Sequence, residues 1–232
     1  MGETVAESLG RVDLLADLAP GELAEVERAC RWRRYATQEQ IIDRQSESRD
    51  VCFVVDGRVR VVNYSVSGRE ITLDDVGQGG WFGELAALDG QPRSASVMAL
   101  APCLIAALPQ DRFLDLVATR PPIAIKVMRH LASIVRTSTD RIMDLSTLGA
   151  NNRVHADLLR QASANANGGN VAEIRPIPVH GDIASRVSTT RETVARVMND
   201  LARQGIVERK KNALVICDVG RLRLLVEDVR GE

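Results

Sequence analysis

A glycine-rich run followed by an arginine is the first place where this sequence could do chemistry. The run is Gly79-Gly80-Trp81-Phe82-Gly83-Glu84-Leu85, and Gly90-Gln91-Pro92-Arg93-Ser94-Ala95 follows it. Glycines allow close backbone approach and leave amide N–H groups free to surround an anion. Arg93 adds a planar guanidinium that matches phosphate oxygens, and Ser94 adds a hydroxyl donor. The pattern predicts a phosphate pocket in which Glu84 has a separate role, such as accepting a hydrogen bond from a ribose hydroxyl.

The same residues fit a second interpretation equally well, in which Glu84 and Arg93 form an ordinary ion pair at a loop. An enzyme acting on nucleotides would need a general base or a metal ion beside the phosphate, and no His or Asp pair has suitable spacing. Metal sites usually have ligands two to five residues apart, whereas the cysteines and histidines here are dispersed. We therefore expect no catalytic residue and no metal ion, and we expect Cys30, Cys52, Cys103 and Cys217 to be ordinary thiols of a reducing compartment.

A second chemically informative segment lies near the C-terminal end of the chain. Residues 191–204 fit a helix with an apolar face made of Val194, Val197 and Leu201. The opposite face carries polar side chains: Glu192, Arg196, Asn199 and Arg203. A shorter predicted helix (182–187) and a tight turn (188–190) precede it, and Gly205 provides a helix stop. A predicted hairpin at 207–216, turning at Asn212, follows it.

This arrangement is suited to entering a DNA major groove. Arg191 and Arg196 could each bind a guanine with two parallel bonds, and Glu192 could accept from cytosine. Phosphates could be bound by four further side chains: Thr190, Thr193, Lys210 and Lys211. From residue 183 to 211 seven basic residues outnumber three acidic ones, giving +4 within a chain whose net charge is −1. The alternative is structural: Thr189 and Glu192 match a capping box, and Glu192 and Arg196 are spaced for a surface salt bridge.

The elements that position the glycine-rich run have the pattern of β-strands. Between residues 31 and 108, short β-branched runs alternate with turn residues at 51–55, 59–62, 71–73 and 94–97. Four glycines recur eleven residues apart: Gly57, Gly68, Gly79 and Gly90. Short strands at such spacing predict a sandwich or barrel closed by hairpins.

The segment 123–149 predicts a long helix. Its apolar residues follow a three-four alternation, in which Ser138 takes one slot: Met128, Leu131, Val135, Ile142 and Leu145. This is the seam of a coiled coil, and it favours a partner helix and a homodimer. An amphipathic helix lying on its own domain is the alternative. We expect a hinge at Asn151-Asn152, a helix at 154–164 and a surface loop at 165–170.

The order and spacing of these features resemble the cyclic-AMP receptor protein family of bacterial transcription regulators, which includes the fumarate–nitrate reduction regulators. The resemblance covers nearly the whole chain. It rests on Gly83-Glu84-Leu85 with Arg93-Ser94-Ala95, on the long helix, and on Arg191-Glu192-Thr193-Val194 with Arg196.

The resemblance implies an α+β fold in three parts. These are an N-terminal β jelly-roll cyclic-nucleotide-binding domain (1–121), a dimerisation helix with its hinge (122–150) and a C-terminal winged helix-turn-helix (151–232). Glu84 would bind the ribose 2′-hydroxyl, while Arg93 and Ser94 would hold the cyclic phosphate. The base would meet Ser138 and Thr139 from the two subunits. The expected ligand-binding set also includes Gly83, Leu85, Val61 and Leu73.

The resemblance also assigns the DNA-reading positions and leaves the effector open. Arg191, Glu192 and Arg196 would read GTGA-like half-sites arranged as an inverted repeat. The order Ser138-Thr139 reverses the best-known pair, Ile134 replaces an arginine that some members place near the base, and Ser188 replaces a common turn glycine. Cyclic AMP is favoured, but cyclic GMP stays possible because the Ser94 hydroxyl can serve a guanine amine. Another effector, or DNA binding without a ligand, is a further alternative.

Composition limits the partners and the compartment. The sequence has 30 Lys and Arg against 31 Asp and Glu, which excludes a globally basic nucleic-acid coat. The longest uncharged stretch, 98–110, contains Pro102 and is too short to span a membrane. No secretory signal is visible at the N-terminus, so we expect a cytoplasmic protein. The scattered cysteines argue against an iron–sulfur cluster, and nothing near the N-terminus suggests a haem ligand. The expected partners are a second copy, double-stranded DNA and RNA polymerase, which relatives contact near 165–170.

Overall fold

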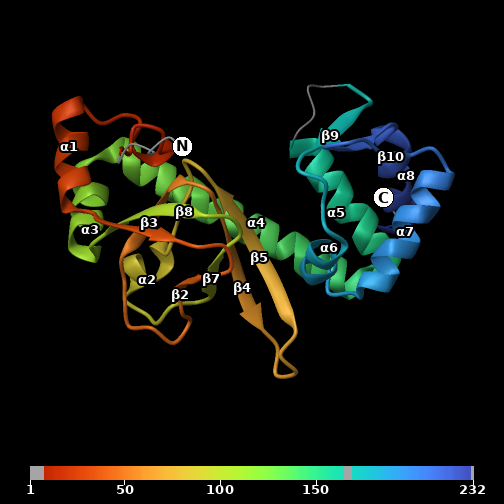
Figure 1. Ribbon diagram of the computed structural model, residues 1–232, viewed down its shortest axis with the longest axis horizontal. Helices are drawn as coiled ribbons and strands as arrows, with labels where there is room; N and C mark the ends of the chain where they lie inside the picture. The colour runs from red at the N-terminus through yellow and green to blue at the C-terminus, as the bar shows by residue number, and fades with distance from the viewer. Residues whose placement is uncertain (1–7, 165–168, 231–232) are drawn as a thin grey trace. The chain divides into compact units, whose positions relative to one another are not determined.

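The chain forms two compact units, residues 1–134 and 135–232, which are described separately. The structure is a computed structural model that describes residues 8–164 and 169–230. The expected α+β class is confirmed, with a β domain first, a long helix after it and a helical domain with a small sheet last (Figure 1). The three-part division at residues 121 and 150 stays a prediction.

The first unit contains two four-stranded antiparallel sheets. One sheet has the order β1 (Arg31–Tyr35), β8 (Cys103–Leu108), β3 (Val51–Asp56), β6 (Trp81–Phe82). The other has the order β2 (Gln40–Ile42), β7 (Ser96–Ala99), β4 (Arg58–Tyr64), β5 (Glu70–Gly77). Most neighbours in each sheet are far apart in sequence, so the chain passes repeatedly between the sheets, as expected for a jelly roll.

The regularly spaced glycines are needed for their backbone conformation. Gly57, Gly68, Gly79 and Gly90 all have positive φ, between +69° and +88°, a region that L side chains rarely adopt. Gly57 also has no room for a side chain, because a Cβ there would lie 2.4 Å from the carbonyl oxygen of Pro102. The sequence pattern therefore located four real turns of the β domain.

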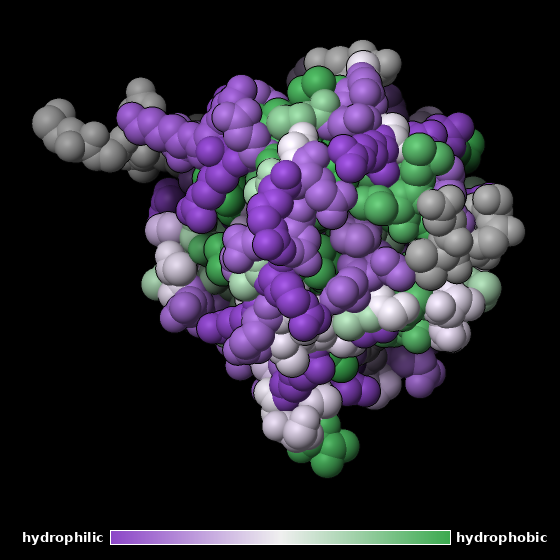
Figure 2. All heavy atoms as spheres, turned by 90° about the vertical axis from the view of Figure 1, so that its right-hand side faces the viewer, coloured by the Kyte–Doolittle hydropathy of each residue, from purple (hydrophilic) through white to green (hydrophobic). Residues whose placement is uncertain are grey.

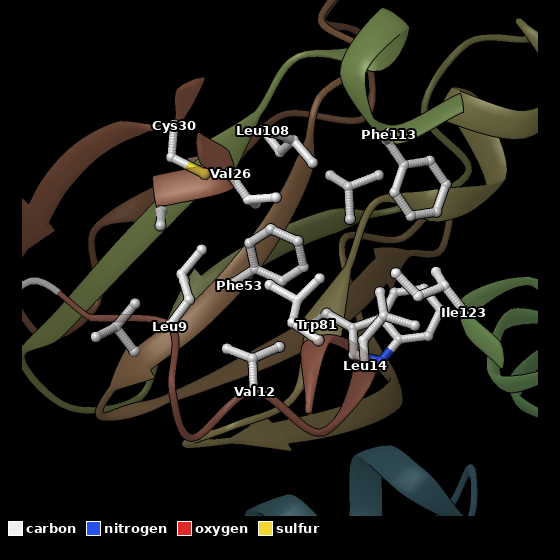
Figure 3. Packing of buried hydrophobic residues seen from close by; sticks show 14 of the residues in the cluster. Leu9, Val12, Leu14, Val26, Cys30, Phe53, Trp81, Leu108, Phe113 and Ile123 are labelled. Carbon is white, nitrogen blue, oxygen red and sulfur yellow. The ribbon is translucent and has the colours of Figure 1, made fainter. Parts of the chain in front are cut away.

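The core of the first unit is formed by buried side chains from both strands and helices. Phe53 lies in the middle of the cluster, and Trp81 lies with Leu14 and Ile123 at one end of it (Figure 3). The helices that contribute to it or border it are α1 (Pro20–Ala29), α2 (Glu84–Asp89), α3 (Gln110–Thr119) and the start of α4 (Pro121–Thr147), with a 3₁₀ turn at Asp13–Leu15. The fold therefore places Trp81 in the core, close before the glycine and glutamate of the predicted pocket.

The long helix α4 (Pro121–Thr147) is present, and its apolar stripe is exposed within the single chain. Ile123 and Val127 are buried in the first unit's core, whereas the stripe further along α4 is not covered. Its large exposed apolar side chains are Met128, Val135, Ile142 and Leu145. Among the helices of the described residues, none is long and apolar enough to cross a membrane.

The helix break lies at Leu148-Gly149, so the hinge predicted at Asn151-Asn152 was placed wrongly. Both asparagines lie in the first turn of α5 (Ala150–Ala164). Asn is tolerated at the start of a helix, where backbone N–H groups lack intrahelical partners, whereas glycine strongly favours leaving the helical state. Gly149 therefore ends a helix more readily than Asn151 or Asn152 would. Leu148 beside it is buried.

The second unit packs α5, α6 (His180–Arg186), α7 (Arg191–Arg203) and α8 (Val219–Arg230) with a three-stranded antiparallel sheet. The sheet has the order β10 (Val207–Arg209), β11 (Leu214–Ile216), β9 (Ala172–Ile174). Val194, Val197 and Leu201 are buried in its core, as the helical pattern predicted. The helix-turn-helix and its hairpin wing are thus confirmed; helix α8 was not predicted. Most of the predicted loop, residues 165–168, lies outside the described residues.

Candidate anion pocket and nucleic-acid interface

Arg93 is buried, and its guanidinium is fixed by the protein. Only 4% of the residue is exposed. Nη1 donates to the carbonyl oxygen of Gly83 at 2.9 Å, and Nη2 donates to Asp50 O at 2.8 Å and Ser48 Oγ at 3.1 Å. The Nε–H is buried and has no partner among the described residues. Burial lowers the pKa of Arg93 from its ordinary value, since desolvation disfavours the charged form. An unpaired buried donor on a cation is the feature expected of a site that accepts an anion.

Gly83 makes this arrangement possible by lacking a side chain. Its φ is +89°, and a Cβ there would lie 2.6 Å from Arg93 Nη1 and 2.9 Å from the carbonyl oxygen of Asp50. Gly83 is also the residue that precedes helix α2, so Glu84 is the first residue of that helix. The glycine-rich run therefore serves one local purpose, which is to bring the backbone against the buried guanidinium.

Glu84 faces a histidine, which the sequence reasoning missed. The Glu84 side chain is 7% exposed, and Oε1 lies 3.7 Å from Nε2 of His130 in α4. The His130 ring also packs on Trp81, with 4.4 Å between ring centroids. Among the ion pairs of the described residues none joins Glu84 to Arg93, so the alternative of a plain pair between them is wrong. Glu84 and His130 are far apart in the sequence, and no local pattern could have linked them.

The remaining pocket candidates of the β domain differ in exposure. Ser94 is exposed, and its carbonyl oxygen accepts from Asn63 Nδ2 at 3.2 Å. Val61 is partly buried against the second core cluster of the β domain. Leu73 is the extra residue of a β-bulge, because Val61 pairs with Asp74 and Val62 with Thr72. Leu73 and Leu85 are both exposed and leave apolar surface available to a ligand.

Two candidates lie outside the β domain. Ser138 and Thr139 are on α4 within the second unit, and both are exposed. Thr139 Oγ1 donates to the carbonyl oxygen of Val135 at 2.9 Å, one turn earlier in the helix. The structure therefore brings Gly83, Glu84 and Arg93 together, while the expected contact of Ser138 and Thr139 with a base stays a prediction.

Sequence reasoning also missed the residues that hold Arg93 and Ser94. Ser48 and the backbone of Asp50 precede β3, and Asn63 lies on β4. Asn63 Oδ1 is buried without a partner among the described residues. The polar loop before β3 was a weak signal for Ser48, since a buried arginine needs acceptors, but many polar loops would fit that description equally.

The start of the predicted recognition helix α7 differs in detail from the expected capping box. Thr190, not Thr189, is the N-cap, and its Oγ1 accepts from the Thr193 N–H at 3.2 Å. Glu192 hydrogen-bonds its own backbone N–H and the Thr190 hydroxyl, which together with Arg191 lower its pKa. The cap shifts by one residue because Thr190 has extended φ and ψ, the conformation of an N-cap. Phosphate contacts by Thr190 and Thr193 stay predictions.

The outer face of α7 carries the predicted reading residues. Arg191, Glu192 and Arg196 are all exposed. Arg191 lies against Gly181 of α6, where a Cβ would be 3.0 Å from its Nε. Arg196 Nη2 donates to Asn151 Oδ1 at 3.3 Å, and none of the ion pairs of the described residues joins it to Glu192. Figure 2 shows a view in which hydrophilic side chains predominate over smaller apolar areas.

The hairpin wing carries the two lysines at its tip. Lys210 and Lys211 are exposed in the turn, which is closed by the Lys210 N–H donating to Ala213 O at 2.9 Å. The turn includes Asn212 as predicted, but its φ is not positive, since Gln38 and Ser188 are the only described non-glycine residues with that conformation. Ser188, with φ +52°, thus occupies a backbone position at which glycine is favoured.

Two arginines near the recognition helix are structural. Arg186 forms an ion pair with Asp157, 3.0 Å between Nη2 and Oδ2, and both side chains are largely buried. Arg153 of α5 donates to three carbonyl oxygens: Leu148 at 2.8 Å, Val187 at 2.8 Å and Ser188 at 3.1 Å. Within the described part of the chain, no group of His, Cys, Asp and Glu is arranged to hold a metal ion.

Comparison with known proteins identifies both halves of the chain. Residues 32–120 match the model of the cyclic nucleotide-binding domain, and residues 152–225 match that of the Crp-like helix-turn-helix domain. The Cyclic AMP receptor protein of Thermus thermophilus is 31% identical over 194 residues, which cover 84% of this chain and 87% of that protein. A ligand-binding β domain joined to a helix-turn-helix defines a transcription regulator, not an enzyme.

The chain belongs to the cyclic-AMP receptor protein and fumarate–nitrate reduction regulator family. Solved structures share the fold at lower identity. A CooA mutant from Carboxydothermus hydrogenoformans superposes with a TM-score of 0.80 and 22% identity, covering 97% of both chains. The c-di-GMP responsive regulator CLP of Xanthomonas campestris superposes with a TM-score of 0.66 and 19% identity, covering 85% of this chain and 99% of that one.

Proposed function

We propose that this chain is a homodimeric transcription regulator whose DNA affinity is controlled by a cyclic nucleotide, with cyclic AMP favoured. The observation that carries the effector assignment is Arg93, a buried cation with an unpaired Nε–H, held beside the positive-φ glycine Gly83. A cyclic phosphodiester brings both a negative charge and oxygen acceptors to such a site. The nearly buried Glu84 supplies an acceptor for the free 2′-hydroxyl of the same ligand.

Further contacts in this proposal come from residues of the β domain and of α4. Ser94 donates to the phosphate or accepts a hydrogen bond from a base amine, and Val61, Leu73 and Leu85 cover apolar parts of the ligand. Ser138 and Thr139 meet the base from the two subunits. The fold does not select the effector, since the Xanthomonas regulator named for c-di-GMP shares it. Cyclic GMP, another effector and ligand-free DNA binding are the alternatives.

The exposed stripe of α4 supports the homodimer. Val135, Ile142 and Leu145 are each more than half exposed and recur at the three-four spacing of a coiled-coil seam. A contiguous apolar stripe of this kind marks an interaction surface, because burying it removes apolar area from water. Two copies related by a twofold axis would pair the same stripe on both subunits.

The second unit supplies the DNA contacts in this proposal. Arg191, Glu192 and Arg196 read bases of GTGA-like half-sites in an inverted repeat, which matches a twofold-symmetric dimer. Lys210 and Lys211 on the wing, with Thr190 and Thr193, contact phosphates. RNA polymerase is the further partner in this proposal, and the cytoplasm is the compartment.

Effector binding controls DNA binding only through contacts that differ between two states. A ligand with equal affinity for both states changes nothing, however tightly it binds. Moving the equilibrium from 1:99 to 99:1 requires a preference of about 5.5 kcal/mol. The phosphate contacts of Arg93 can supply affinity, whereas contacts of the base with α4 of both subunits can supply the difference between the states.

The proposal is tested by calorimetric titration of cyclic AMP and cyclic GMP, with and without palindromic DNA. We expect nucleotide binding by the wild type, heavy loss in Arg93→Ala and tighter DNA binding when nucleotide is present. Arg44→Ala, which removes an exposed arginine of the same unit, is the matched control. Arg93→Lys keeps the charge, and thermal melts show whether each variant is folded. Equal nucleotide binding by wild type and folded Arg93 variants would remove the pocket assignment.

A further inference from the structure

The pair Glu84 and His130 joins the predicted pocket to the long helix inside the first unit. Glu84 begins α2 and is almost completely buried, and its Oε1 is 3.7 Å from His130 Nε2. His130 extends from α4, and its ring packs against Trp81, whose own side chain is part of the core. The imidazole is therefore held between a core aromatic ring and a carboxylate.

We propose that His130 is a positioning residue for the effector: its imidazole, packed on Trp81, holds the Glu84 side chain in place to accept a hydrogen bond from a cyclic nucleotide's free 2′-hydroxyl. This inference rests on the proposed function of the pocket and adds a residue to it. His130 acts through Glu84 and need not touch the ligand.

The burial of Glu84 is the physical reason for such a partner. An ionised carboxylate removed from water is costly unless a cation or several donors compensate it. Among the ion pairs of the described residues, the only one that includes Glu84 is with His130. Ile134, one turn further along α4, offers no charge, and Arg93 is directed to Gly83, Ser48 and Asp50.

The groups around His130 favour its charged form. The nearby Glu84 carboxylate, as a hydrogen-bond acceptor, raises the pKa of His130 above its ordinary 6.5; burial opposes this, and the charges of Glu84 and Asp74 of β5 add to the rise. On α4 itself, Lys126 pairs with Asp17, and Arg129 is exposed. Trp81 contributes an uncharged ring. Within the described structure, the charged groups that act on the imidazole are therefore the carboxylates of Glu84 and Asp74.

A consequence for ligand binding follows from proton linkage. If the charged imidazole supports the hydrogen bond to the ribose, nucleotide affinity falls as the pH rises through the pKa of His130. Binding at a pH above this pKa then takes up a proton. A cyclic 2′-deoxynucleotide lacks the hydroxyl that Glu84 would accept from, so its affinity should depend much less on the state of His130.

The experiment is calorimetric titration of the full chain with cyclic AMP and with cyclic 2′-deoxy-AMP between about pH 6 and pH 9, a range that includes the pKa of a histidine raised above its ordinary value. Buffers of different ionisation enthalpy report the protons taken up. We expect the affinity for cyclic AMP to fall about three- to tenfold over this range, because the neutral imidazole no longer attracts the Glu84 carboxylate and so fixes its position less firmly. The 2′-deoxy compound should show a nearly flat profile. Arg129→Ala, which removes an exposed charge next to His130 on α4, should behave as the wild type.

Two substitutions at His130 complete the test. His130→Gln removes the charge and should give weak cyclic AMP binding that does not change with pH. His130→Arg keeps a permanent charge and should restore binding without pH dependence. Failure of the wild type to bind any cyclic nucleotide would overturn the proposed function together with this inference. Normal binding with the same pH profile in wild type and His130→Gln, or with the 2′-deoxy compound, would overturn the inference alone.

Discussion

Asp144 and Arg160 form an ion pair across the break between α4 and α5, with 2.5 Å between Oδ2 and Nη1. The carboxylate of Asp144 is 3% exposed, whereas the Arg160 side chain reaches solvent. Aspartate is rarely buried unless it is paired. The contact therefore connects the last turns of α4 to the third turn of α5 and fixes the angle of the chain at Leu148-Gly149.

Removal of Arg160 should destabilise the second unit. Breaking a fully buried pair by deleting one partner costs about 3–5 kcal/mol, and we expect roughly 2 kcal/mol for Arg160→Ala because the arginine is partly solvated. Amide hydrogen exchange in α5 measures this loss. Trp32 and Trp81, the two tryptophans, lie in the first unit, so the unfolding transition seen by their fluorescence should not move.

A matched control for this prediction exists on α7. Arg203 and Asp200 form an exposed pair, for which truncation should change the free energy of unfolding by less than about 1 kcal/mol. Replacement of both Asp144 and Arg160 by leucine should recover much of the loss, because paired buried charges are often replaced at little cost. Equal effects of Arg160→Ala and Arg203→Ala would contradict the importance of the buried pair.

The exposed stripe of α4 predicts the oligomeric state. Ile142→Arg places a charge within the proposed seam, where Ile142 is 63% exposed in the single chain. We expect light scattering after size exclusion to show wild type at twice 25.3 kDa and the variant at 25.3 kDa. Asp140→Arg adds a positive charge on the opposite, exposed face of α4 and should leave the mass unchanged. A wild type that is monomeric at micromolar concentration would refute the homodimer.

The two kinds of DNA contact should separate in their salt dependence. Arg196→Ala should cost roughly 1–3 kcal/mol and relax the preference at one base pair. Lys210→Ala combined with Lys211→Ala should weaken all sequences alike, and the slope of log K against log salt should fall by about 0.9 for each phosphate that is no longer neutralised. Fluorescence anisotropy on single-base operator variants measures both. An unchanged specificity profile for Arg196→Ala would exclude its reading role.

The cysteines should differ sharply in reactivity. Burial raises the pKa of both Cys30 and Cys52 to about 12, so the thiolate, which is the nucleophile, is scarce near neutral pH. Cys103 is buried too, whereas Cys217 is partly exposed. A maleimide reagent followed by mass spectrometry should label Cys217 rapidly and the other three only after denaturation. The fast label should disappear in Cys217→Ser, and rapid labelling of Cys30 would contradict its burial.

His155 should weaken the second unit in acid. Burial lowers its pKa below 6.5, and Asp200 only partly opposes this. The unfolded chain therefore takes up a proton near its ordinary pKa that the folded unit resists, and stability falls as the pH drops below that value. We expect NMR titration to place the pKa of His155 below 6.5 and that of His130 above it. In His155→Gln, the amide hydrogens of α5 should lose less of their protection from exchange as the pH falls. An unchanged loss would mean that other groups cause it.

Local patterns predicted those parts of the fold that depend on neighbours in sequence. The eleven-residue glycine spacing located turns because positive φ is a property of single residues. Val194, Val197 and Leu201 located the buried face of α7 because helix periodicity is local. The break predicted near Asn151 lies instead at Gly149, since both residue types punctuate helices and only the full backbone decides between them.

The candidate site was predictable only where its motif is continuous in sequence. Gly83, Glu84 and Arg93 could be named because they belong to one short segment. The contacts that fix their geometry come from Ser48, Asp50 and His130, which reach them only through the folding of separate strands and of α4. Propensity and periodicity carry no information on such distant pairings.

The three carbonyl bonds of Arg153 give the second unit an unusual mechanical property. Its planar guanidinium donates both to Leu148, at the break after α4, and to Val187 and Ser188, just before α7. A torsional change at Gly149 must either carry the start of α7 along with it or break these bonds. Motion at the α4–α5 break is thus coupled to motion at the start of α7. Arg153→Lys would remove this coupling, because a lysine lacks the planar guanidinium that reaches all three acceptors.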